Sequence, residues 1–274
     1  LMDGYNDSNY PDVTPERDGK RLIVQPNTFN MYCHREPRFY LTVVWNGQWF
    51  KWENRNTNFL YGQPDGGPTH DAPQNGYLNR SRVSLDYIPR DNNHPYRPAI
   101  IFRMAEAYLS YAEALNESSE RMSHKQEILD NLNKIRHRAG IAEYGTGTDE
   151  NGFTRIKINF SDQKEVRRLI HKERRVEFVG EGVRYHDLRR WKTAHYGIGN
   201  LNEQGENPDW GVNGPDYGMN YYGTEYTDQG DNAFFKRTKY MDRVYPRKFY
   251  WYPIHQSEID KDPTLVQGPF WLGE

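Results

Sequence analysis

The feature that most constrains the fold is a helical period in the hydrophobic side chains, which occurs twice in succession. Apolar residues recur three or four positions apart in residues 98–117 and again in residues 123–140, which is the spacing of one helix face. Pro98 suits a first helical turn, and Ser123 with Gln126 matches a capping box. Because only a short linker separates the two patterns, we expect two antiparallel neighbouring helices.

These two helices need further helices to pack against. Several alanines in the first helix permit close packing, but a single pair leaves an apolar face uncovered, as in a tetratricopeptide-type unit. Helical patterns in residues 161–180 and 183–194 can supply neighbours, and Asp162 with Glu165 is a second capping-box pattern. We therefore predict a mainly α fold that is built on tetratricopeptide-type helix pairs.

Outside the helical patterns the chain is rich in loops and poor in strands. Residues 38–52 carry the strongest strand signal, and the dipeptide Asn46-Gly47 within them favours a tight hairpin turn. Residues 53–97 and 195–235 are polar and turn-rich, and loops of this length are usually functional or disordered. We expect a large loop-rich portion with a minor content of β structure.

Charge and composition exclude several classes of protein. The formal net charge is −2, which leaves no electrostatic footprint for nucleic acid. Only 35% of the residues are hydrophobic, yet 40 of the 274 are Phe, Trp or Tyr, so rings must build part of the core. Cys33 is the only cysteine, which excludes an internal disulfide framework. There is no membrane-spanning run and no signal peptide, and we expect a mature or truncated chain.

Glu173 and Glu177 are the carboxylates whose spacing best suits glycosidase chemistry. They lie on one face of the predicted third helix, and glycosidases use two carboxyl groups about 5–9.5 Å apart. Arginines crowd the same segment, and pairing with them would keep both carboxylates ionised, which a general acid cannot be. We expect a structural ion-pair network here. The arginines are Arg174, Arg175, Arg184, Arg189 and Arg190.

No motif indicates a metal, a cofactor or an activated nucleophile. The nine histidines show no recurring ligand spacing. Residues 149–152 could touch Ca²⁺, but they lack the alternating ligands of an EF-hand loop, so a solvated turn is the better interpretation. Glycine-rich phosphate loops are also absent from the sequence. We therefore expect no cofactor and no metal site.

Aromatic side chains beside polar ones indicate a ligand surface in residues 45–65. The C–H face of a sugar packs on a ring, and its hydroxyls need amide, guanidinium or carboxylate partners. A small core beneath the loops is the alternative. The candidate residues are Trp45, Trp49, Trp52, Asn54, Arg55, Asn58, Tyr61 and Asp65. A second cluster with a weaker claim comprises Trp210, Tyr217, Tyr221, Tyr222 and Tyr226.

Several ordered motifs follow one another along the chain. They are Pro37–Phe39, Val44–Gly47, Arg103–Leu109, Ala112–Ala114, Leu132–Gly140, Glu173–Phe178, Gly182–Arg184, Asp187–Trp191 and Tyr252–Ile259. These motifs resemble those of the SusD/RagB family of outer-membrane nutrient-binding lipoproteins from Bacteroidetes. The resemblance departs at His255, where the family commonly has proline, and residues 195–235 do not align with it.

The resemblance implies a fold and a setting for this chain. Family members capture oligosaccharide, or peptide in some cases, and deliver it to a SusC-like TonB-dependent transporter without catalysis. They sit on the extracellular face of the outer membrane through a lipidated N-terminal cysteine, which is not Cys33. The chain would be the C-terminal part of one SusD-like domain, with a ligand-facing region in 1–97, a helical core in 98–194, and a loop-rich excursion and tail in 195–274.

Three hypotheses about function follow. The first is a non-catalytic surface protein that binds glycans and delivers them to the transporter. The second is a peptide-binding receptor of the RagB type, in which the same aromatic loops would line a peptide groove. The third, which the crowded arginines disfavour, is a glycoside hydrolase that uses Glu173 and Glu177.

Overall fold

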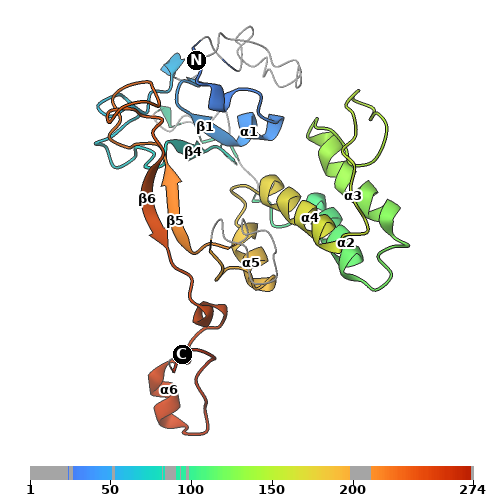
Figure 1. The fold of residues 1–274 in the computed structure, drawn as a ribbon. Helices are drawn as coiled ribbons and strands as arrows, with labels where there is room; N and C mark the ends of the chain where they lie inside the picture. Colours follow the sequence, from blue (N-terminus) through green and yellow to red (C-terminus); the bar gives the residue numbers. More distant parts are fainter. Residues whose placement is uncertain are drawn as a thin grey trace. The chain divides into compact units, whose positions relative to one another are not determined.

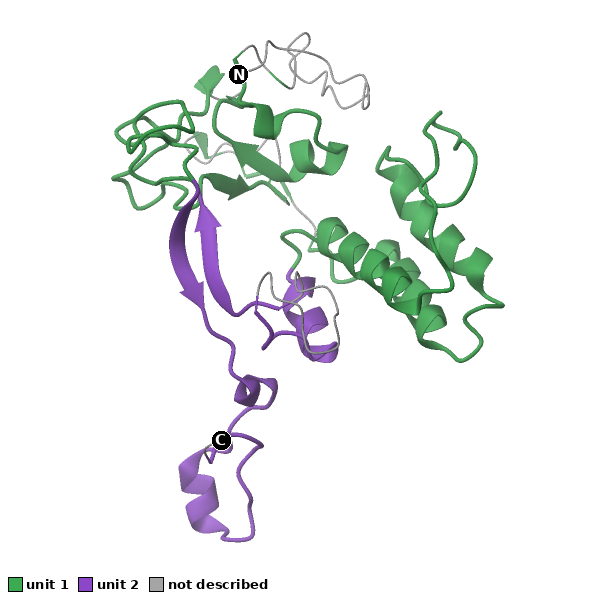
Figure 2. Cartoon of the chain, viewed as in Figure 1, with its two compact units in different colours: residues 1–181, 219–236 green, residues 182–218, 237–274 purple. Residues whose placement is uncertain are grey.

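The chain divides into two compact units (Figure 2). Unit 1 comprises residues 1–181 and 219–236, and unit 2 comprises residues 182–218 and 237–274. The structure is helix-rich, with two-stranded sheets and long loops (Figure 1), which confirms the predicted fold class. No described helix is long and apolar enough to cross a membrane. The computed structural model describes residues 24, 27–50, 53–81, 83, 91–92, 94–96, 99–197 and 211–272.

We call three neighbouring helices the helical part of unit 1: α2 (Met104–Glu117), α3 (Lys125–Arg138) and α4 (Gln163–Glu177). Helix α2 packs against both α3 and α4. Each helix buries an apolar face, and side chains such as Leu109 and Ile170 are fully enclosed. The predicted helix pair and its third neighbour are therefore confirmed.

The N-terminal ends of α2 and α3 differ from the prediction. Pro98 lies outside the described residues, and α2 begins at Met104 because Arg103 is extended, with φ −142°. The Arg103 guanidinium donates hydrogen bonds to the carboxylates of Glu181 and Glu177. Ser123 does not cap α3, because its hydroxyl donates to the Glu120 carbonyl at 2.7 Å.

Residues 38–52 do not form the predicted hairpin. Residues Pro37–Thr42 form helix α1, and one strand follows on each side of the Asn46-Gly47 turn. These two strands pair with other segments instead of with each other. The antiparallel pairs are β1 (Val43–Trp45) with β4 (Tyr77–Asn79) and β2 (Trp49–Phe50) with β3 (Arg55–Asn56).

The Asn46-Gly47 turn is present, but the strands on its two sides do not pair with each other. The Gln48 N–H donates to the Trp45 carbonyl at 3.2 Å, and Gly47 has a φ of +92°. The Asn46 side chain is buried, and its Oδ1 accepts a hydrogen bond from the Phe59 N–H at 2.6 Å. The amide therefore binds the segment after β3, and long-range contacts decide the strand partners.

An aromatic core holds the strands and loops of unit 1 together. Tyr32, Trp45, Phe59 and Phe234 are each at most 3% exposed and belong to one cluster. The cluster joins residues before position 60 to the segment 219–235. Rings therefore build a core in this aliphatic-poor chain, as the composition indicates.

Unit 2 has a smaller core around Leu188, Ala194 and Tyr245. The predicted fourth helix ends earlier than expected, at Arg190. The elements of unit 2 are α5 (Val183–Arg190), β5 (Gly214–Gly218), β6 (Thr238–Arg243), η7 (Arg247–Tyr250) and α6 (Gln256–Lys261). Strands β5 and β6 form an antiparallel pair with an irregularity between Asp216 and Tyr217.

Candidate functional site

Trp45 is part of the core and not of a ligand surface. It is 1% exposed, and Phe39 stacks on its ring with the centroids 5.6 Å apart. It ends β1 opposite Tyr77 of β4, and Thr57 Oγ1 donates to its carbonyl at 2.7 Å. Its ring has no face to offer a sugar, so the structure corrects the prediction for this residue and supports the alternative of a core beneath the loops.

The next predicted residues lie on and after β2. Trp49 is half-buried and lies in β2, opposite Asn56 of β3. Asn54 is exposed with φ +51°, at the turn between the two strands. Trp52 lies outside the described residues. Asn54 is therefore open to a ligand, while Trp49 offers only part of its ring.

Arg55, Asn58 and Asp65 form a brace inside their own loop. Arg55 Nη1 and Nη2 donate to the two carboxylate oxygens of Asp65 at 2.6 and 2.8 Å, and the Asn58 N–H donates to Asp65 Oδ2 at 2.8 Å. Burial by itself raises the pKa of Asp65, but the hydrogen bonds from Arg55 and Asn58 outweigh it and hold that pKa below its usual range. These predicted ligand residues shape the loop and are largely engaged with one another.

Tyr61 meets two aromatic residues from a distant part of the chain. Its ring centroid lies 6.1 Å from that of Tyr221 and 5.6 Å from that of Tyr222, and the latter two rings are 5.1 Å apart. Tyr222 is 70% exposed, whereas Tyr61 and Tyr221 are half-buried. We call these three residues the tyrosine surface. It unites members of both aromatic clusters that the sequence suggests.

Close backbone contacts hold the two loops of the tyrosine surface in place. The Tyr61 N–H donates to the Gly223 carbonyl at 2.8 Å. A Cβ at Gly67 would lie 2.6 Å from the Tyr221 ring, and one at Gly223 would lie 2.4 Å from Phe234 Cα. Since neither position has room for a side chain, glycine is required for the rings to meet.

Other members of the second aromatic cluster lie elsewhere. Tyr226 packs on the aromatic core, and its hydroxyl accepts a hydrogen bond from the Phe29 N–H at 3.1 Å. Tyr217 belongs to unit 2, where the Arg237 guanidinium lies 3.8 Å from its ring centroid. Trp210 lies outside the described residues. Sequence spacing could not distinguish these three residues from Tyr221 and Tyr222, because all five lie in one loop-rich stretch of the sequence.

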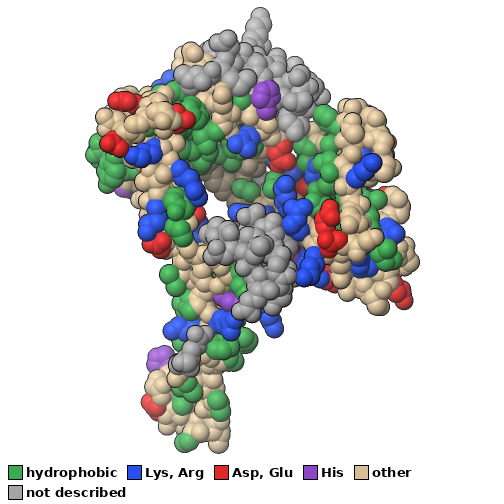
Figure 3. Space-filling view, in the orientation of Figure 1, with side chains coloured by type: hydrophobic (Ala, Val, Ile, Leu, Met, Phe, Trp, Pro, Cys, Tyr) green, Lys and Arg blue, Asp and Glu red, His purple; other side chains and the backbone are tan. Residues whose placement is uncertain are grey.

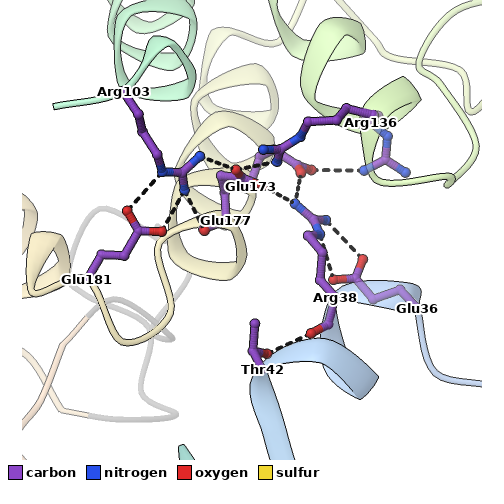
Figure 4. A network of polar contacts seen from close by, with 9 residues as sticks. Glu36, Arg38, Thr42, Arg103, Arg136, Glu173, Glu177 and Glu181 are labelled. Carbon is purple, nitrogen blue, oxygen red and sulfur yellow. Dashed lines mark hydrogen bonds and ion pairs between the residues drawn. The ribbon is translucent and has the colours of Figure 1, made fainter. Parts of the chain in front are cut away.

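The two glutamates considered for glycosidase chemistry are buried in an ion-pair network (Figure 4). Arg38 Nη1 donates to Glu173 Oε1 at 2.6 Å and to Glu177 Oε2 at 3.1 Å. Arg136 Nη1 donates to Glu173 Oε2 at 2.9 Å, and Arg103 Nη1 donates to Glu177 Oε1 at 2.5 Å. Both glutamate side chains are only 3% exposed. The predicted structural network is confirmed.

The arginines in this network come from other elements than expected. Those that pair with Glu173 and Glu177 lie on α1, directly before α2 and on α3. Arg138 also pairs with Glu177, and Arg103 pairs with Glu181 at 2.7 Å. Figure 3 shows basic and acidic side chains close together on the helical part of unit 1. The network therefore ties distant segments together.

The charges around Glu177 do not suit a general acid. Burial by itself raises the pKa of Glu177, but the hydrogen bond from Arg103 and the charge of Arg138 outweigh it and hold that pKa below its usual range. A carboxylate that stays ionised at neutral pH cannot donate the proton that glycoside cleavage requires. The arrangement is suited to stability.

The turn at Asp149 is likewise structural. Its carboxylate accepts hydrogen bonds from the N–H groups of Glu143, Asn151 and Phe153 at 3.1, 3.0 and 2.9 Å. The expected turn is present, but Asp149 itself is buried and not solvated. Within the described ranges, no group of three or more His, Cys, Asp or Glu side chains could hold a metal ion.

A cavity of about 910 Å³ lies between α3 and residues 143–160, and sequence reasoning did not suggest it. In its lining, Arg155 Nη2 donates to Glu143 at 2.9 Å, and the Lys134 ammonium lies 4.5 Å from the Tyr108 ring centroid. None of the ligand residues that the sequence predicts lines this cavity, so the tyrosine surface remains the candidate site.

Comparison with known sequences identifies the relatives of this chain. The sequence model described as the SusD family matches residues 1–271. Two proteins of Formosa agariphila, SusD-like protein P25 and SusD-like protein P38, are 32% identical to it over 109 and 103 residues. These alignments cover 40% and 38% of this chain but only 18% and 19% of those proteins.

Solved structures share the fold. A SusD-like protein from Bacteroides fragilis NCTC 9343 superposes with a TM-score of 0.60 and 27% identity, over 89% of this chain and 40% of that one. A second protein from the same organism, described as a SusD-like carbohydrate binding protein, gives a TM-score of 0.57 and 23% identity, over 89% and 45%. The chain thus spans less than half the length of these neighbours.

Proposed function

The chain belongs to the SusD family, and from that premise we propose that it binds oligosaccharide at the tyrosine surface without transforming it. The observation that carries this proposal is the meeting of Tyr61, Tyr221 and Tyr222 from two separate loops. The C–H face of a pyranose packs on such rings, while phenol hydroxyls and nearby amides can hydrogen-bond its hydroxyls.

The loops support this role because contacts within the chain hold them in place. The Arg55–Asp65 brace and the close backbone contacts at Gly67 and Gly223 hold the rings in one arrangement. A surface that is already ordered loses little conformational entropy when it binds, so more of the contact energy appears as affinity.

We further propose that the bound glycan passes to a SusC-like TonB-dependent transporter on the extracellular face of the outer membrane. Family membership supports this role. One solved neighbour with the same fold is described as a carbohydrate binding protein. The ion-paired state of Glu173 and Glu177 favours a non-catalytic role over a hydrolase.

The test is isothermal titration against a panel of plant, host and microbial polysaccharides. Tyr61→Ala and Tyr222→Ala each remove one ring, and we expect each to weaken binding by about 1–2 kcal/mol, or about 5–30-fold. Tyr252→Ala is the matched control, because Tyr252 is 79% exposed but lies in unit 2. We expect its affinity to match that of the wild type.

Other outcomes would contradict the proposal. A polysaccharide that binds both tyrosine variants as tightly as the wild type would show that the tyrosine surface is not the site. Capture of peptides from a mixture, with no polysaccharide bound, would favour the RagB-type receptor. Release of reducing sugar that Glu173→Gln abolishes would show a hydrolase.

A further inference from the structure

We infer that the tyrosine surface selects neutral oligosaccharides and discriminates against those that carry carboxylate or sulfate groups. This inference rests on the proposed function and narrows the class of ligand. It is carried by the charges on the two loops that supply the rings, residues 58–76 and 219–236, both of which belong to unit 1 and are fully described.

These two loops are acidic, although the whole chain is nearly neutral. They carry five carboxylates and one ammonium, a formal charge of −4 with His70 counted as neutral, against −2 for all 274 residues. An anionic ligand that approaches such a surface is repelled, because charges of one sign raise its energy at the point of encounter. The charged residues are Asp65, Asp71, Glu225, Asp228, Asp231 and Lys236.

The cations at these loops already have carboxylate partners. Lys236 Nζ lies 2.8 Å from Asp231 Oδ1, and Arg55, which braces the first loop, binds Asp65 through two nitrogens. Arg237, the next basic residue along the chain, belongs to unit 2, where it lies over the Tyr217 ring. Recruiting Lys236 or Arg55 to an anionic sugar would break an existing ion pair.

Neutral hydroxyls find better partners on this surface than anions do. Gln63 is exposed and carries two amide donors, and the hydroxyls of Tyr61 and Tyr222 can donate or accept. A carboxylate or sulfate only accepts, and it needs cationic donors to replace the water that it loses against the rings. Asp228 and Glu225, both exposed, offer only further acceptors.

The experiment compares one polysaccharide in two charge states. The neutral polysaccharide that binds best in the panel is oxidised at its primary hydroxyls to carboxylates, and both forms are titrated at 0.05 and at 0.5 M salt. We expect the oxidised form to bind the wild type about tenfold more weakly or worse at low salt, and the difference to shrink at high salt.

A pair of charge-reversal variants separates local from overall charge. The double variant Glu225→Lys with Asp228→Lys should recover about tenfold in affinity for the oxidised form at low salt. The control, Glu258→Lys with Asp260→Lys on α6, changes the net charge equally but lies in unit 2. It should leave the discrimination unchanged.

The outcomes distinguish this inference from the proposed function. Equal or tighter binding of the oxidised form by the wild type overturns the neutral selectivity, while glycan binding itself still stands. An equal gain by the α6 control overturns the local origin of the selectivity. If neither form of any polysaccharide binds, the proposed function fails, and the inference fails with it.

Discussion

At the scale of single residues, exposure separates aromatic side chains that look alike in the sequence. Trp45 and Tyr61 come from the same polar and aromatic stretch, yet Trp45 is 1% exposed in the core while Tyr61 lies at the surface beside Tyr222, which is 70% exposed. A buried ring stabilises the fold by excluding water, whereas an exposed ring is available to a ligand. Residue type alone does not decide between these roles.

Glu177 gives a prediction about pH. Its folded-state pKa lies below the unfolded value of about 4.3, so its stabilising contribution is full above that value and is lost as pH falls through the folded pKa. Glu177→Gln leaves Arg103 without a charged partner at this position and should cost about 3 kcal/mol of unfolding free energy at pH 7.

Urea unfolding at pH 7 and at pH 3.5 measures this effect. The wild type should lose more unfolding free energy between the two pH values than Glu177→Gln, because glutamine does not titrate. Glu258→Gln is the control, since its pair with Lys261 is solvent-exposed and should contribute less than about 1 kcal/mol. The same pH dependence in wild type and Glu177→Gln would contradict the role of the network.

At the scale of elements, local sequence signals locate the helices better than the strands. Helix α4 begins one residue after Asp162, whose side chain accepts hydrogen bonds from the N–H groups of Lys164 and Glu165. The strands around Asn46-Gly47 were predicted as a hairpin, but each takes another partner. A helix satisfies its backbone within itself, whereas a strand needs a partner that the local sequence does not specify.

The cap of α4 can be tested directly. Asp162→Ala removes the acceptor for two helix N–H groups and should lower the unfolding free energy by about 1 kcal/mol. Ser161→Ala is the matched control, because Ser161 is exposed and precedes the cap. Thermal unfolding monitored by circular dichroism compares them. A larger loss for Ser161→Ala than for Asp162→Ala would show that Asp162 is not the cap.

At the scale of the whole molecule, an aromatic core and an ion-pair network join segments that are far apart in sequence. Phe234 packs with Tyr32, Trp45 and Phe59 in one cluster. Arg38 bridges to Glu173 across 135 positions. The tyrosine surface depends on the core, because Phe234 belongs to the core and its carbonyl accepts a hydrogen bond from the Asn220 N–H, next to Tyr221, at 2.9 Å.

Phe234→Ala should therefore affect both stability and binding. Loss of a fully buried ring costs about 3–5 kcal/mol of unfolding free energy, and the loop after Met219 loses its anchor. Phe102→Ala is the control, because Phe102 is 61% exposed. Urea unfolding and glycan titration measure the two effects. Unchanged stability of Phe234→Ala would contradict the importance of this core.

The sequence by itself determined helices α2 to α5, the Asp162 cap, the existence of a charge network around Glu173 and Glu177, and the family. These features depend on spacing within one segment or on motifs that stay in order along the chain. The amino-acid composition also predicted that aromatic rings would replace aliphatic side chains in part of the core.

Only the tertiary structure decided which arginines bind the two glutamates, which strands pair, and which rings remain exposed. It buried Trp45, engaged Arg55 with Asp65, and brought Tyr61 to Tyr221 and Tyr222 from another loop. The physical reason is that burial and pairing depend on which distant segments meet. The local sequence around a residue does not specify which distant segments it will contact.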